Sequence, residues 1–310
     1  QGILLCLALT VLIGAVPTAD LPLAFLLATA FGLLTTGLMA SFFHLGRPER
    51  AWRAARMWRT SWLSREVIVL PLLLGVVAWW WCLEVTGRDT SFLPVLAILA
   101  VLALWICTSM IYISIRFIQE WAHPMTAIHF LLTGLSSGLV WVVAIALAMG
   151  HDAFATVLLP WAAVVTLAAG TVRMLSLHRN ARLRPVSTLQ SATGIQASKL
   201  TQKSMGMSAG AFNTREFFHQ VSLAGFRKVR LLFLLLAFAL PTAYLGWAVV
   251  TGLGHLMWLV LPVQTMGLLA ERWFFFAQAQ HPQNLYYQVV SWAERWFFFA
   301  QAQHPQNLYY

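Results

Sequence analysis

The stretch FLPVLAILAVLALWICTSMIYISI, from Phe92 to Ile115, decides the fold class of this chain. It runs for 24 residues without one Asp, Glu, Lys or Arg. A helix crosses the bilayer core with roughly 20 apolar residues, and the lipid offers its backbone no hydrogen-bond partner. Because an uninterrupted helix satisfies its own backbone, this stretch is predicted to span a membrane.

Seven further apolar runs accompany it, and the whole chain is correspondingly poor in charge. Only 10% of its 310 residues are charged and 60% are apolar, whereas soluble domains carry about 25% charged residues. We predict an all-α integral membrane protein, a bundle of about eight transmembrane helices. The other runs are Ile3–Val16, Leu21–Leu45, Val67–Thr86, Met125–Gly150, Phe154–Leu177, Leu231–Val250 and Leu253–Ala277.

The runs divide the chain into a membrane domain, residues 1–277, and a tail, residues 278–310. The first run is short and the chain begins at Gln1, so we expect further residues before it. Residues 178–230 form a long basic loop between the sixth and seventh runs. The 17 residues ERWFFFAQAQHPQNLYY that begin at Glu271 recur from Glu294. This repeat is either a duplication or an artefact, and no function is assigned to its second copy.

Basic residues are distributed unequally between the two ends of the predicted bundle. Nineteen of the 20 Lys and Arg residues fall in or beside segments that share one face, and only Arg88 belongs to the other. Lys and Arg in short loops are retained on the cytoplasmic side of a membrane. We therefore predict a multi-pass protein whose basic face, together with both chain ends, is cytoplasmic.

The sequence argues against several kinds of site. Cys6, Cys82 and Cys107 share no motif spacing, and without a Cys-x-x-Cys pair neither an iron–sulfur cluster nor a structural zinc site is expected. We predict no catalytic residue and no metal ligand. No Asp, Glu, Lys or Arg lies near the centre of a run, so ion pumping is not indicated. Small residues such as Gly134 and Gly138 are expected to allow close helix packing.

The densest polar stretch lies between the second and third runs, from His44 to Glu66. Gly46 and Pro48 end the preceding helix, and arginines then recur every three residues. On an α-helix this spacing drifts by about 60° per step, so we expect the arginines to wrap a short interfacial segment instead of forming one straight stripe. They either anchor the segment to lipid phosphates or dock an acidic partner. The candidate docking residues are Arg50, Arg53, Arg56 and Arg59.

Several polar side chains return to the same end of the bundle and could hold a quinone. His44, where the second run meets water, changes protonation near neutral pH, which suits a group that accepts protons from a quinol. Glu66 stands at the start of the third run. With side chains from later runs, these two could bind both quinone oxygens. The predicted site comprises His44, Arg47, Glu66, Tyr112, Arg116 and His123.

Two other functions stay open at this point. A b-type haem needs histidines at matched depth on facing helices, and only His44 and His129, with His123 as a substitute, meet that condition. A haem-containing cytochrome anchor is therefore the first alternative. A transporter acting alone is the second, although the polar residues near the middle of the runs are mild ones such as Thr108 and Gln264.

At His44–Glu66 the sequence resembles the membrane anchor subunit family of dimethyl sulfoxide reductase. FHLGRPERAW (Phe43–Trp52) and RTSWLSREV (Arg59–Val67) carry the most specific part of the resemblance. It continues in CTSMIYISIR (Cys107–Arg116), in WAHP (Trp121–Pro124) and in LLAERWFFFAQAQHPQNLYY (Leu268–Tyr287). The similarity covers most of the chain, and the family's eight helices agree with the predicted number.

The resemblance implies an anchor in a bacterial inner membrane with no haem, iron–sulfur cluster or molybdenum of its own. Its partners would be an iron–sulfur electron-transfer subunit, a molybdopterin catalytic subunit and the lipid bilayer, and not nucleic acid. It would exchange electrons with membrane quinone, either menaquinone or ubiquinone. The family's quinol-site histidine and acidic residue correspond to His44 and Glu66. Relatives include anchors of sulfite:quinone oxidoreductases, a branch that the basic face and the last run favour slightly.

Overall fold

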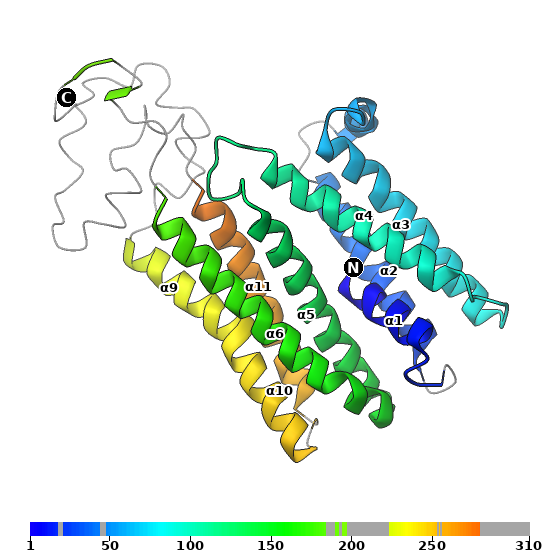
Figure 1. Ribbon diagram of the computed structural model, residues 1–310. Helices are drawn as coiled ribbons and strands as arrows, with labels where there is room; N and C mark the ends of the chain where they lie inside the picture. Colours follow the sequence, from blue (N-terminus) through cyan, green and yellow to red (C-terminus); the bar gives the residue numbers. More distant parts are fainter. Residues whose placement is uncertain are drawn as a thin grey trace.

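Helices built from the predicted apolar runs make up the computed structural model of this protein (Figure 1). The structure describes residues 1–17, 21–43, 48–183, 190–191, 194–196, 223–252, 254 and 256–279, and no strand occurs among them. The helices are α1 (Gly2–Ile13), α2 (Leu23–Phe43), the 3-10 helix η2 (Pro48–Met57), α3 (Trp62–Val85), α4 (Leu93–Ile113), α5 (Pro124–Ala148), α6 (Asp152–Ala181), α9 (Leu223–Phe233), the π-helix η4 (Leu234–Ala239), α10 (Leu240–Thr251) and α11 (Met257–Ala277).

Among the described residues, six helices are long and apolar enough to cross a membrane. They are α2 to α6 and the continuous helix Ala224–Thr251, to which α9, η4 and α10 contribute. α1 has only 12 residues, and α11, with 21, is made less apolar by Gln264, Glu271 and Arg272. The all-α membrane architecture is therefore confirmed. The predicted number of eight transmembrane helices is not confirmed, because only six described helices are long and apolar enough to span a membrane.

α1 is short, yet it packs between α4 and α5 inside the bundle. Gly2 of α1 meets Gly134 and Gly138 of α5 at backbone contact. A Cβ on Gly138 would lie 2.2 Å from the Gly2 carbonyl carbon, so only glycine permits this approach. The expected role of these small residues in close helix packing is confirmed.

The continuous helix of α9, η4 and α10 widens into a π-helix just before Pro241. Proline has no backbone N–H, so it cannot bond to the carbonyl of Ala237 four residues earlier. That carbonyl accepts a hydrogen bond from Gln264 Nε2 of α11 at 3.5 Å instead. Gly267 of α11 packs against the same turn, because a Cβ there would come within 2.3 Å of Ala237 N. The irregular turn thus forms the surface against which α11 packs.

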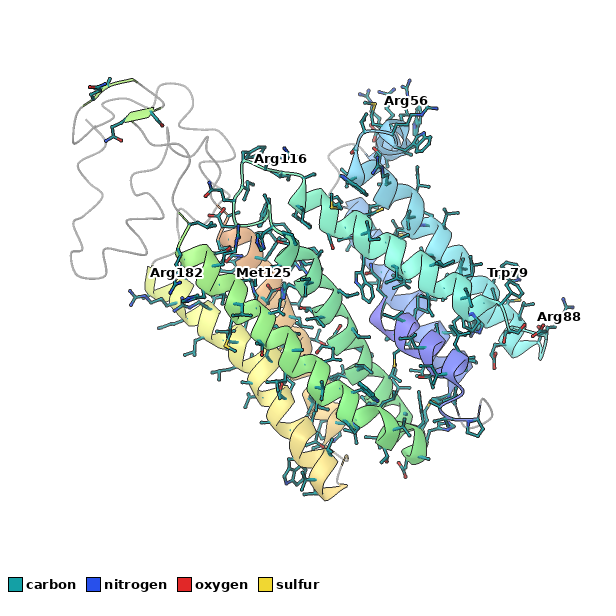
Figure 2. The ribbon with its side chains drawn as sticks, viewed as in Figure 1. Arg56, Trp79, Arg88, Arg116, Met125 and Arg182 are labelled. Carbon is teal, nitrogen blue, oxygen red and sulfur yellow. The ribbon has the colours of Figure 1, made fainter. Side chains whose placement is uncertain are left out.

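The start of α3 and α5 and the last turns of α4, α6 and α11 share one end of the bundle, named here the basic end. Figure 2 shows Arg56, Arg116 and Arg182 at this end and Arg88 at the opposite one. The predicted loop 178–230 is partly helical at both margins, since α6 continues to Ala181 and α9 begins at Leu223. Most residues between these helices, and the tail from residue 280, lie outside the described part of the chain.

Candidate functional site

Glu66 lies in the second turn of α3, at the basic end. Ser61 caps this helix, because its Oγ accepts a hydrogen bond from Ser64 N at 3.4 Å. Glu66 is half-buried and faces α4, where the Thr108 hydroxyl donates to Glu66 Oε1 at 2.5 Å. A carboxylate held in this way can still use its second oxygen to accept a proton or a hydrogen bond from a ligand hydroxyl.

Tyr112 lies one turn beyond Thr108 on the same face of α4. Its ring meets four others edge-on, with centroid distances between 5.3 and 5.8 Å. Such edge-to-face contacts hold aromatic rings in fixed orientations. The set is named here the aromatic cluster, and it consists of Tyr112, Trp121, Phe130, Phe275 and Phe276.

Arg272 of α11 reaches the aromatic cluster from the other side. Its guanidinium carbon lies 4.1 Å from the centroid of Phe130 and 5.5 Å from that of Phe275. The Tyr112 ring contacts Phe130 edge-on, with centroids 5.5 Å apart, and Thr108, one turn before Tyr112, donates a hydrogen bond to Glu66. Side chains of four helices, α3, α4, α5 and α11, are therefore linked here by successive contacts. They are named the Glu66 site, which comprises Glu66, Thr108, Tyr112, Phe130 and Arg272.

Arg116 follows α4 and is exposed at the basic end. It lines a cavity of about 370 Å³ together with Gln119, Ala122, Leu183 and two further arginines, Arg179 and Arg182. Arg179 is held in place because it donates to the Gln119 carbonyl at 3.2 Å. The structure thus places Arg116 among cations on the rim of the bundle. Among the described residues, Arg116 makes no hydrogen bond or ion pair with Glu66 or Tyr112. That Arg116 binds quinone therefore stays a prediction.

His123 is the N-cap of α5, where its Nδ1 accepts a hydrogen bond from Met125 N at 3.2 Å. Partial burial, and then the nearby Arg179 guanidinium, lower the pKa of this imidazole below its usual value. His123 is therefore neutral at pH 7, as an N-cap acceptor must be. Of the other predicted site residues, His44 and Arg47 lie outside the described residues.

A buried ionic cluster that the sequence did not predict lies next to the Glu66 site. Arg173 Nε is 2.9 Å from Glu271 Oε1, and His129 Nε2 is 3.0 Å from the same oxygen. These three side chains are at most 2% exposed. Arg173 was counted among the basic residues of the cytoplasmic face, but it lies two turns inside α6. Ionisable side chains inside a membrane protein are costly and usually functional.

The ionic cluster bears directly on the haem alternative. His129 Nε2 contacts Glu271, and its Nδ1 is 3.1 Å from the Thr133 hydroxyl. An axial haem ligand needs one imidazole nitrogen for iron, and here each already has a partner on the protein. The proposed pairing of His129 with His44 would break one of these buried contacts.

The ionic cluster is one level of a repeating pattern along α6 and α11. Seven residues make about two helical turns, or roughly 10.5 Å. One level inwards, Ser136 of α5 contacts Thr166 at 2.8 Å and accepts from Gln264 at 3.0 Å. This spacing is the signal that could have revealed the cluster from the sequence. The repeated positions are Thr166, Arg173 and Asn180 on α6 and Gln264, Glu271 and Gln278 on α11.

The candidate docking arginines lie on or just after the 3-10 helix η2, and all four are exposed. A 3-10 helix has three residues per turn, so Arg50, Arg53 and Arg56 form one straight row. The expectation that they could not align was wrong, because it assumed α-helical geometry. Trp52 lies beside Arg53, with the guanidinium carbon 5.5 Å from its ring. The three aligned arginines are named the arginine row.

The comparisons with known proteins agree with the resemblance. The family model described as the DMSO reductase anchor subunit (DmsC) matches residues 2–277. A sulfite dehydrogenase subunit of Allochromatium vinosum is 46% identical over 273 residues, which are 84% of this protein and 84% of that relative. A polypeptide of the anaerobic dimethyl sulfoxide reductase of Escherichia coli is 30% identical over 179 residues, 54% of this protein and 61% of that relative. No solved structure matches. The protein therefore belongs to the DMSO reductase anchor subunit (DmsC) family.

Proposed function

We propose that this chain is the quinone-reactive membrane anchor of a molybdenum oxidoreductase that oxidises sulfite. Membership of the anchor family and the name of the relative in Allochromatium vinosum support the anchor role and the substrate class. The quinone assignment rests mainly on the surroundings of Glu66. Glu66 is a half-buried carboxylate that accepts from Thr108, one turn from the aromatic cluster, at the end of two apolar spans.

The proposed reaction balances across the complex. Oxidation of sulfite to sulfate by a catalytic partner, with one water molecule, releases two electrons and two protons. Reduction of quinone to quinol consumes two electrons and two protons. In this chain, Glu66 exchanges a proton with a quinone oxygen, and the Thr108 hydroxyl orients the carboxylate. The aromatic cluster provides flat surfaces against which the quinone ring packs.

The partners dock at the basic end, which we propose to be cytoplasmic. Electrons tunnel only over short distances, so an iron–sulfur subunit must approach the membrane close to Glu66. The arginine row begins the segment that leads into α3 and therefore lies at that end. Exposed guanidinium groups attract an acidic protein surface and orient it during encounter.

The test uses the whole complex, purified in mild detergent through a tag on this chain. Sulfite-dependent reduction of a short-chain ubiquinone analogue is compared with sulfite-dependent reduction of a soluble dye that bypasses the anchor. Glu66→Gln is expected to lower the quinone rate about a hundredfold, within the range lost with an acid–base group, and to leave the dye rate unchanged. Glu84→Gln, the same change at the opposite end of α3, is the control. Equal quinone rates in both variants would refute the assignment of Glu66.

Co-purification in the same experiment tests the anchor role separately. Molybdenum and non-haem iron should accompany the tagged chain, and the reduced-minus-oxidised spectrum should lack a haem band. A haem band would favour the cytochrome alternative. A chain that purifies without partners would favour a transporter.

A further inference from the structure

Glu271 and Arg272 are neighbours on α11, but their side chains enter different surroundings. Glu271 is 1% exposed and lies in the ionic cluster with Arg173 and His129. Arg272 is half-buried and turns to the aromatic cluster, where it stacks over Phe130. Successive helical residues point about 100° apart, so one turn of α11 serves both the ionic cluster and the Glu66 site.

The charges of this turn do not cancel. Arg173 and Glu271 form a pair, which leaves the Arg272 guanidinium as a further positive charge, whatever the protonation of His129. Within the described part of the chain, the direct contacts of Arg272 are two aromatic rings and no hydrogen-bond acceptor. A guanidinium carries five N–H donors, and inside a membrane these donors are costly to leave unmatched. Among the described residues, no hydrogen-bond acceptor therefore faces the Arg272 guanidinium.

A quinone headgroup would supply such an acceptor. It is a flat ring with carbonyl oxygens on opposite edges, and it gains negative charge as electrons arrive. Glu66 of α3 accepts from Thr108, one turn before Tyr112, and Arg272 of α11 stacks over Phe130, which contacts Tyr112 edge-on. Glu66 can serve the oxygen that exchanges a proton, and Arg272 can donate hydrogen bonds to the other oxygen.

We propose that Arg272 binds the second carbonyl oxygen of the quinone and stabilises the negative charge of the semiquinone and quinolate forms. The inference rests on the proposed function of the Glu66 site. Arg272 keeps its own proton throughout, since guanidinium groups do not titrate near neutral pH, so both protons of the reduction come from elsewhere. Phe130, stacked under Arg272, holds the guanidinium plane at the edge of the site.

The experiment compares Arg272→Gln, Arg272→Lys and the control Arg227→Gln in the tagged complex. Arg227 is an exposed arginine of α9, outside the Glu66 site. For Arg272→Gln, the KM for the short-chain ubiquinone analogue should rise about tenfold, the loss expected for one charge-assisted hydrogen bond. The semiquinone signal in electron paramagnetic resonance during a redox titration should fall by a similar factor. Sulfite-dependent dye reduction should stay at the wild-type rate.

The outcomes separate the inference from the function on which it rests. If the wild-type complex cannot reduce the quinone analogue, the proposed function fails. If the wild type reduces it and Glu66→Gln impairs it, but Arg272→Gln keeps the wild-type KM and semiquinone signal, only the inference fails. Should Arg272→Gln prevent assembly, Arg272→Lys decides. It keeps the charge but not the forked donors, so an unchanged KM and semiquinone signal in that variant would overturn the role of Arg272.

Discussion

Arg173 and Glu271 form an ion pair inside the bundle, with Nε and Oε1 2.9 Å apart and each side chain only 1% exposed. The partners belong to α6 and α11, which are far apart in the chain. Charges removed from water are tolerated only when they are matched. The pair therefore fixes α11 against the centre of the bundle, and its removal should be costly.

Glu271→Gln should destabilise the protein by about 3–5 kcal/mol, because Arg173 would remain as a buried charge without its counter-ion. The measurement is the unfolding temperature of the purified complex in detergent. Replacement of both partners by methionine should recover much of the loss, since an apolar pair leaves no unmatched charge. Glu84→Gln serves as the single-site control. An unfolding temperature of Glu271→Gln equal to the wild-type value would contradict the ion pair.

Gly267→Ala should lower the free energy of unfolding of the protein by about 1–3 kcal/mol, the usual range for overpacking, because it disturbs the packing of α11 on the π-helix. The reason is that its Cβ would come within 2.3 Å of the Ala237 backbone nitrogen. Gly246→Ala in α10 is the matched control, because a Cβ there meets nothing within 4 Å. Thermal unfolding in detergent checks both variants. Equal unfolding temperatures would mean that α11 does not approach the π-helix this closely.

If the proposed sulfite-oxidising partners dock on the arginine row, replacement of Arg50, Arg53 and Arg56 by glutamine should weaken their retention about tenfold, as expected when three exposed charge contacts are lost. The measurement is the dye-linked sulfite activity left on membranes after washes of rising salt, which screens such contacts. Arg227→Gln with Lys228→Gln removes exposed charge from α9 and is the control. Identical wash curves would identify the arginine row as a lipid anchor only.

The proposed orientation can be tested by labelling introduced cysteines in a variant without the native ones. Thr60→Cys lies at the basic end and Asp89→Cys beside Arg88 at the other, and both positions are exposed. If the basic end is cytoplasmic, a membrane-impermeant maleimide should label residue 89 in intact spheroplasts and residue 60 only after lysis. The reverse pattern would place the partners outside the cytoplasm.

His123 should make the basic end less stable in acid. Because its pKa is lowered in the folded protein, the unfolded chain binds the proton more readily. The stability from the neutral His123 cap is full above about pH 6.5, the ordinary histidine pKa, and is lost as the pH falls below it. His123→Asn keeps an N-cap acceptor without a titrating group. Its unfolding temperature should therefore fall less between pH 7 and pH 5.5 than that of the wild type.

The sequence predicted the positions of the helices well, because the membrane demands long apolar runs. The run Met125–Gly150 corresponds to α5 (Pro124–Ala148), and Phe154–Leu177 corresponds to α6 (Asp152–Ala181). α6 is longer than its apolar run because the backbone stays helical where the side chains become polar. Gly134 and Gly138 were recognised as packing residues from their small size alone.

The site was harder to predict, because contacts between distant helices leave little local trace. Glu66 was chosen from its position and from the family resemblance, and Tyr112 from its position alone; the structure places them on neighbouring helices, with Thr108 between them. Arg272 was only counted among the basic residues of one face, and nothing within α11 alone shows that it turns to Phe130. The arginine row was misjudged for a different reason: a three-residue period was tested against an α-helix and not against a 3-10 helix.

The polar levels of α11 also have a consequence for how the protein is made. A helix that carries Gln264, Glu271 and Arg272 enters a bilayer poorly by itself, since charged residues oppose translocon insertion, by up to about 2.5–3.5 kcal/mol for an Arg at the helix centre. Its partners on α5 and α6 are synthesised earlier. When α11 leaves the ribosome, Ser136 and Arg173 are already in the membrane and can receive it. Insertion of α11 into the membrane should therefore depend on the helices synthesised before it. Loss of Arg173 from α6 should appear in cells as failed membrane insertion of α11.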